Sequence, residues 1–244
     1  MGEAGRTSIR NADGRGRLGT VLSGLAVAVG CVLFLGGFAW GAVVYKPYTV
    51  PSDSMTPSIK AGDRVLAERM AGEQVRRGDV VVFTDRTWGA MPMVKRVVGV
   101  GGDRIVCCDA RSRLLLNGKP LEEPYLRAQA DTAGQPFSAT VPEGRLFLLG
   151  DERRTSVDSR GHLMEAGKGT VPVSAVEARV DAVAWPVGGV LERPRPFAEL
   201  PGGVSEPGPV KPVVTAAVVG ALLIFGGAAY GPLSKLGGRR KVRV

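Results

Sequence analysis

Three serines lie in a short segment that follows the first long apolar run of this 244-residue chain. The segment reads PSDSMTPSIKAGDRVL, from Pro51 to Leu66. A serine hydroxyl becomes a nucleophile when a neighbouring base removes its proton, and both histidine and lysine act as that base in hydrolases. The segment therefore predicts hydrolytic chemistry if the rest of the chain supplies such a base.

Two side chains are candidates for the base. His162 is the only histidine, and it lies in a polar, glycine-flanked loop, DSRGHLMEAGKG, where a lone histidine is usually solvated. A lysine base must be neutral near pH 7, far below its ordinary pKa of about 10.4, so it must be buried. Among the lysines between residues 46 and 212, only Lys95 lies inside a strand-like apolar run, MPMVKRVVGV. From that run alone, a strand lysine that is ion-paired or reaches solvent is the commoner explanation.

The region that must position these residues is predicted to be mostly β. Short apolar, β-branched runs recur between turn residues, and no long helical period competes with them. Asn117-Gly118, between apolar neighbours, predicts a tight hairpin. The runs are 63–70, 78–85, 94–100, 103–108, 113–121, 145–151 and 178–187.

Two uncharged apolar runs, 18–45 and 213–233, are each long enough to cross a bilayer. A cleaved secretory signal is the alternative for the first run and a buried core helix for the second. The flanking ends are basic, which favours a cytoplasmic location for both termini and places the middle region outside. The predicted organisation is a basic N-terminus, a membrane helix, an extracytoplasmic β domain, a Pro/Gly linker, a second membrane helix and a basic tail: 1–17, 18–45, 46–200, 201–212, 213–233 and 234–244.

Charge and cysteine content argue against other classes. The net charge of +9 is concentrated at the two ends, whereas a nucleic-acid-binding domain usually carries its charge on the folded part, so no nucleic-acid partner is expected. Cys107 and Cys108 are adjacent and would point to opposite faces of a strand, so a bridge between them would be strained. With Cys31 in an apolar run and no histidine cluster, we expect no disulfide framework, no metal and no cofactor.

Four blocks between Pro51 and Arg160 resemble those of the type I signal peptidases, in the same order: PSDSMTP with its following Gly-Asp, GDVVVF, VKRVVGVGGD and GDERRTSVDSR. NGKPLEEPYL is also similar to a segment of that family. The resemblance implies a signal-peptidase-like β fold and a membrane-bound Ser-Lys endopeptidase that removes signal peptides from exported preproteins. It also implies a plasma-membrane location, contact with the lipid bilayer and proximity to the secretion translocon.

The resemblance also implies a role for each matching residue. Ser54 matches the nucleophile and Lys95 the general base, while the Ser52 hydroxyl and the Ser54 N–H match the oxyanion hole. Ser156 matches a serine that orients the lysine, within a supporting set of Arg96, Gly150, Ser156, Asp158 and Arg160. Substrates would carry small residues at the first and third positions before the cut, in pockets lined by Val50, Pro51, Met55, Ile59, Met93 and Val94.

The block from Gly150 to Arg160 departs from the family pattern at Glu152, Arg154 and Thr155, which changes its charge and bears on substrate preference. Two alternatives share the same motifs. A self-cleaving, repressor-type Ser-Lys protease would be cytoplasmic, and the two apolar spans argue against it. A catalytically silent membrane scaffold or binding module on the same fold is the second alternative, and the retention of each catalytic residue type argues against it.

Overall fold

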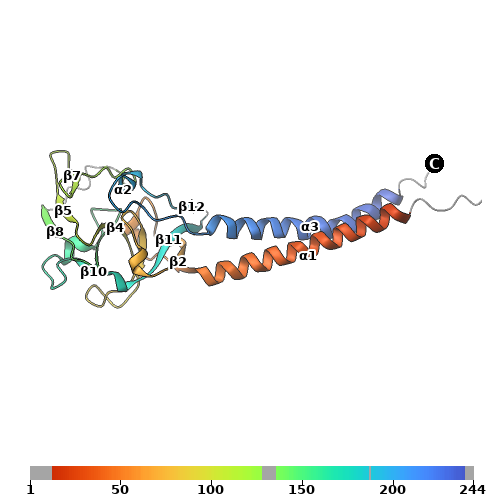
Figure 1. The fold of residues 1–244 in the computed structure, drawn as a ribbon, viewed down its shortest axis with the longest axis horizontal. Helices are drawn as coiled ribbons and strands as arrows, with labels where there is room; N and C mark the ends of the chain where they lie inside the picture. The colour runs from red at the N-terminus through yellow and green to blue at the C-terminus, as the bar shows by residue number, and fades with distance from the viewer. Residues whose placement is uncertain (1–12, 128–135, 187, 240–244) are drawn as a thin grey trace, which may run out of the picture. The chain divides into compact units, whose positions relative to one another are not determined.

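The computed structural model describes residues 13–127, 136–186 and 188–239. It divides into two compact units, one made by two long helices and one made by residues 43–210 (Figure 1). The first unit contains α1 (Asp13–Val44) and α3 (Val210–Arg239). Both helices include stretches long and apolar enough to cross a membrane, Leu18–Val44 and Val210–Tyr230.

The two long helices lie side by side, and glycines set how closely they approach. A Cβ added to Gly30 would lie 2.8 Å from the carbonyl oxygen of Gly220, and one added to Gly220 would lie 2.5 Å from the backbone nitrogen of Phe34. Real Cβ atoms are not found at such distances, so the contact depends on glycine at both positions. This use of glycine is common where helices pack within membranes.

The second unit is built around an eight-stranded antiparallel sheet with the order β1-β2-β11-β3-β4-β9-β10, and β12 pairs with β11. Each predicted apolar run between 63 and 187 contributes a strand to this sheet or to a smaller one, whereas β1, β10 and β12 of this sheet and the strand Phe137–Thr140 of the smaller one were not predicted. The strands are β1 (Tyr45–Thr49), β2 (Arg64–Arg69), β3 (Val80–Phe83), β4 (Met93–Val100), β9 (Arg145–Leu149), β10 (Thr170–Pro172), β11 (Val176–Trp185) and β12 (Gly189–Val190).

A smaller antiparallel sheet has the order β7-β6-β5-β8. Its strands are β5 (Arg104–Cys107), β6 (Leu114–Leu116), β7 (Lys119–Pro120) and β8 (Phe137–Thr140). Asn117 and Gly118 join β6 to β7 with positive φ angles of 53° and 80°, as the predicted two-residue hairpin requires. Short helical segments complete the unit: η1 (Asp53–Met55), η2 (Gly72–Gln74), η4 (Ser159–His162), η5 (Val173–Ala175) and α2 (Arg195–Ala198).

The expectation for the adjacent cysteines was wrong, because the structure joins Cys107 to Cys108 in a disulfide. The expectation assumed that both residues lie on one strand. However, β5 ends at Cys107. Cys108 therefore lies outside the strand, and the rule that adjacent strand residues point to opposite faces does not apply to this pair.

The ends of the β unit meet at one place. Tyr45, at the start of β1, packs with Ala182 of β11 and with Val210, the last residue of the unit, in a small buried cluster. The Tyr45 hydroxyl also donates a hydrogen bond of 3.1 Å to the buried carboxylate of Asp181. The entry and exit of this unit are therefore held against the same strand.

Candidate active site

Ser54 lies in η1, a single 3₁₀ turn. The turn follows Ser52, whose backbone is extended (φ −141°, ψ 161°), and its last residue, Met55, is fully buried in the hydrophobic core. The Ser54 carbonyl accepts a hydrogen bond of 3.0 Å from the N–H of Glu152. The turn is thus held both by the core and by the loop after β9, while the Ser54 side chain stays half-buried.

Lys95 reaches this serine from β4, which pairs with β3 on one side and β9 on the other. Its Nζ lies 2.8 Å from Ser54 Oγ, within hydrogen-bond distance. Lys95 is only 5% exposed, and its neighbours in the strand are mostly apolar. The structure therefore brings together the serine and the one lysine that the sequence placed in an apolar run.

Burial has an electrostatic consequence for Lys95. Loss of solvent around the amine lowers its pKa, and the negative charges of Asp158 and Asp151 raise it by less, so the pKa is lowered on balance. A neutral amine has a lone pair that can accept the Ser54 hydroxyl proton. The position of Lys95 thus favours the state that a general base needs.

Ser52, predicted for the oxyanion hole, also lies beside Ser54. Its hydroxyl donates a hydrogen bond of 3.2 Å to Ser54 Oγ. Both residues leave their side chains accessible to a substrate, because Ser52 is exposed and Ser54 is half-buried.

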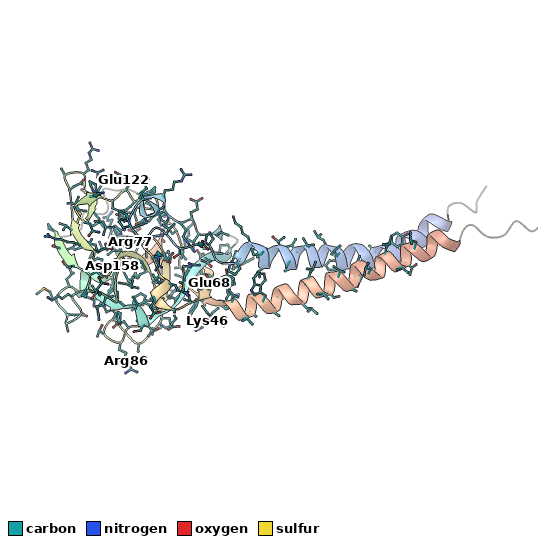
Figure 2. The ribbon with its side chains drawn as sticks, in the orientation of Figure 1. Lys46, Glu68, Arg77, Arg86, Glu122 and Asp158 are labelled. Atoms are coloured by element: carbon teal, nitrogen blue, oxygen red, sulfur yellow. A yellow bond between two sulfur atoms is a disulfide. The ribbon has the colours of Figure 1, made fainter. Side chains whose placement is uncertain are left out.

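Three residues of the predicted supporting set, Gly150, Asp158 and Arg160, form one hydrogen-bonded network. Asp158, labelled in Figure 2 and fully buried, accepts hydrogen bonds from the Gly150 N–H at 3.0 Å and from the Arg160 guanidinium at 2.8 Å. Arg160 also donates to the carbonyl of Arg153 at 2.8 Å. Asp158 therefore ties the end of β9 to η4.

Ser156 occupies a different position from the one expected. Its hydroxyl is buried and, among the described residues, forms no hydrogen bond, including none to Lys95. A Cβ added to Gly150 would lie 2.1 Å from Ser156 Oγ and 2.5 Å from the carbonyl oxygen of Ser54. Ser156 thus packs against Gly150, close to the Ser54 carbonyl.

Arg96, in β4, holds the loop that follows β9. Its guanidinium forms a fully buried, two-bonded ion pair with Asp151, with bonds of 2.8 and 2.7 Å, and also donates to the Gly78 carbonyl. Since adjacent strand residues point to opposite faces, β4 presents Lys95 on one face and this anchor on the other.

A second buried ion pair was not predicted. Arg153 donates to the Gly150 carbonyl at 2.9 Å and pairs with Glu123, and the Tyr125 ring lies over the Arg96 guanidinium at 4.1 Å. Glu123 lies in the segment EEPY, where the preceding Glu122 is exposed. Its role depends on tertiary contacts that no local pattern reveals.

The residues predicted to line the substrate pockets divide into two groups. Val50, Met55, Ile59 and Val94 belong to one buried hydrophobic cluster, and Met55 and Ile59 have no exposed surface. Pro51 is exposed and Met93 is half-buried. The first group lies in the core that holds the serine turn, and the second is accessible at the surface.

His162 does not join the serine. Its ring stacks on that of Trp88 with centroids 4.3 Å apart, and its Nδ1 lies 2.7 Å from a carboxylate oxygen of Glu165. It is therefore packed instead of solvated, contrary to what is usual for a loop histidine. No group of three or more metal-ligating side chains occurs among the described residues.

A half-buried serine hydroxyl in contact with a buried lysine amine is an arrangement that can perform nucleophilic hydrolysis. The comparisons with known proteins define the family. The model of the family described as signal peptidase, peptidase S26, matches residues 21–185. The chain belongs to this family.

Individual relatives agree with this assignment. A probable signal peptidase I of Mycobacterium leprae (strain TN) is 32% identical over 201 residues, which cover 59% of this chain and 69% of the relative. Signal peptidase I U of Bacillus subtilis (strain 168) is 35% identical over 127 residues, 48% of this chain and 66% of the relative. The matches thus span about two thirds of each relative.

A crystal structure of a signal peptidase I from Enterococcus faecalis V583 shares 29% identity with this chain and covers 43% of it and 94% of its own length, with a TM-score of 0.35. The family assignment rests on the sequence matches. It supports the removal of signal peptides as the activity and implies preproteins as substrates.

Proposed function

We propose that this protein is a membrane-bound signal peptidase that cleaves preproteins with Ser54 as nucleophile and Lys95 as general base. The observation that carries the proposal is the 2.8 Å contact between the two side chains, made by a lysine that is 5% exposed. Lys95 accepts the hydroxyl proton as Ser54 Oγ attacks the scissile carbonyl, and then passes it to the leaving amine. A water molecule, activated by the same lysine, releases the acyl group.

The tetrahedral intermediate needs donors for its oxygen. The Ser54 N–H and the Ser52 hydroxyl are the proposed donors, and the 3.2 Å contact of the Ser52 hydroxyl with Ser54 Oγ supports this role. Each such donor lowers the barrier by roughly 3 kcal/mol where it acts on the transition state.

The buried residues around the pair act as positioning residues. Asp158 holds Gly150, whose neighbour in space is the Ser54 carbonyl. Arg96 and Asp151 neutralise each other under the strand that carries Lys95. The Ser156 hydroxyl, which forms no hydrogen bond among the described residues, packs against Gly150 and is proposed to hold that glycine in place.

The two apolar helices are proposed to anchor the β unit on the outer face of the plasma membrane, with both basic termini in the cytoplasm. Contact with the bilayer would bring Ser54 close to signal peptides ending in small-x-small, beside the secretion translocon. Pro51 and Met93, the accessible members of the predicted pocket set, would face the residues before the cut.

The test is cleavage of a preprotein with a small-x-small site by the full-length protein in detergent. We expect Ser54→Ala and Lys95→Ala each to lower kcat by several orders of magnitude, and Lys119→Ala, at an exposed position of β7, to leave it unchanged. Thermal melts of all variants exclude unfolding as the cause. If Lys95→Ala cleaves normally, the dyad is refuted, and if the wild type is inert while it binds preprotein, the silent scaffold is favoured.

A further inference from the structure

An open surface cavity of about 710 Å³, lined by polar and charged residues, adjoins the serine turn and has no part in the proposed dyad. It is formed by η1 and the residues after it together with the loop that follows β9. Its lining residues are Asp53, Thr56, Lys60, Arg127, Glu152, Arg154 and Thr155. The cavity therefore begins at the residue next to the nucleophile.

Side chains of the loop after β9 alternate between two locations, the buried ion pairs and the cavity. Asp151 and Arg153 are buried in the ion pairs with Arg96 and Glu123. Glu152 and Arg154, which alternate with them, line the cavity, and these are two of the three positions at which this block departs from the family pattern. The inner residues hold the loop in place, so the outer residues can vary without disturbing Ser54.

The cavity lining has three cations, Lys60, Arg127 and Arg154, and two carboxylates, Asp53 and Glu152, so it carries a net positive charge of one. Lys60 and Arg127 are exposed, and neither forms an ion pair with a described carboxylate. The Asp53 carboxylate is engaged locally, because its Oδ1 accepts hydrogen bonds from the Thr56 hydroxyl at 3.3 Å and from the Ala61 N–H at 3.0 Å. A carboxylate from a ligand would therefore find Lys60 available.

The position of the cavity indicates which part of a substrate would enter it. This step rests on the proposed function, in which the residues before the cut lie over Pro51 and Met93. Neither of these residues lines the cavity. Since a polypeptide continues in one direction through the scissile bond, its residues after the cut leave Ser54 on a different side, and the cavity next to Asp53 offers them space.

We propose that this cavity binds the first residues of the mature protein, those that follow the cut, and that Lys60 makes it selective for an acidic side chain at one of them. The selectivity acts on the leaving part of the substrate, separately from the small-residue pockets before the cut. Because Lys60 is exposed, the effect is modest, and we expect roughly a two- to fivefold preference for an acidic over a basic side chain.

The experiment uses full-length protein in detergent and a preprotein series that is identical up to the cut. Alanine, aspartate or lysine is placed at each of the first three positions after it, and kcat/KM is measured for the wild type, Lys60→Gln, Lys60→Glu and Lys119→Glu. We expect the wild type to prefer aspartate at one position, Lys60→Gln to lose that preference and Lys60→Glu to invert it. Lys119→Glu, which changes an exposed lysine on β7, should behave as the wild type.

Two controls separate the possible failures. Higher salt should shrink the preference, because exposed charges are screened, and a bulky residue placed before the cut should slow all four proteins equally. If the wild type cleaves every substrate at one rate, or if the preference persists in Lys60→Gln and Lys60→Glu, the selectivity is refuted while the peptidase stands. If no substrate is cleaved, the proposed function fails, and this inference fails with it.

Discussion

Gly150 offers a direct test of how closely the support network holds the nucleophile. In Gly150→Ala, the added Cβ would lie 2.5 Å from the carbonyl oxygen of Ser54 and 2.1 Å from Ser156 Oγ. Ordinary contact begins at 3.4 Å, so the serine turn must move by about 0.9 Å unless the β9 loop yields instead. The loop is held by the buried Asp158 bond to the Gly150 N–H, so we expect most of the shift to fall on Ser54.

The shift acts on the 2.8 Å contact between Ser54 and Lys95. A misplacement of this size can cost about a hundredfold in rate, so we expect kcat to fall by roughly thirty- to a hundredfold, with a smaller change in KM. Overpacking should also lower the free energy of unfolding by about 1–3 kcal/mol. Steady-state cleavage and thermal or urea unfolding of the same preparations measure both effects.

The matched control is Gly161→Ala, because a Cβ at that position meets nothing within 4 Å. It should leave kcat and stability close to the wild type. A double variant, Gly150→Ala with Ser156→Gly, removes the clash with the serine side chain but keeps that with the Ser54 carbonyl, so it should regain stability more than activity. Wild-type kcat in Gly150→Ala would show that Ser54 does not depend on this contact, and the positioning argument would be wrong.

Two further predictions concern charge. As the proposed general base, Lys95 must be neutral to act, so kcat/KM should fall as the pH drops through its lowered pKa. The charge of Asp158 raises that pKa, so Asp158→Asn should move the acidic limb of the pH profile to lower pH. A limb that moves to higher pH would contradict this sign. Glu123→Gln leaves the Arg153 guanidinium buried without its carboxylate and should cost about 3–5 kcal/mol in urea unfolding. Glu122→Gln, at the exposed neighbouring position, should cost at most about 1 kcal/mol, and equal losses in both variants would refute the assigned role of the buried pair.

The local sequence pattern predicted the main strands because buried β-strands consist of short apolar runs between turn residues. It did not predict β1, whose sequence YKPYT contains a charge and a proline. Proline is tolerated there because β1 is the edge strand of its sheet. The disulfide was not predicted because the end of β5 at Cys107 depends on pairing with β6 and β8, which the local sequence does not show.

The candidate site was predictable to the extent that it depends on residue type. The apolar run around Lys95 indicated burial, but residue type alone did not separate a buried base from a paired lysine, because the difference lies in the contact with Ser54. Glu123 was not predictable, since its partner Arg153 is thirty residues away. Ser156 was expected to bind the lysine, yet its hydroxyl packs against Gly150 because the glycine leaves space there.

The meeting of Tyr45 and Val210 on one strand has a thermodynamic consequence. If the two apolar helices remain in contact while the β unit unfolds, the roughly 170 residues between them stay a closed loop in the denatured state. Closing a loop of this length removes chain entropy that, for a covalent crosslink, corresponds to about 5 kcal/mol. The helix pair would then act as a reversible crosslink. Loss of either helix would lower the free energy of unfolding of the β unit, although the contacts within that unit are unchanged.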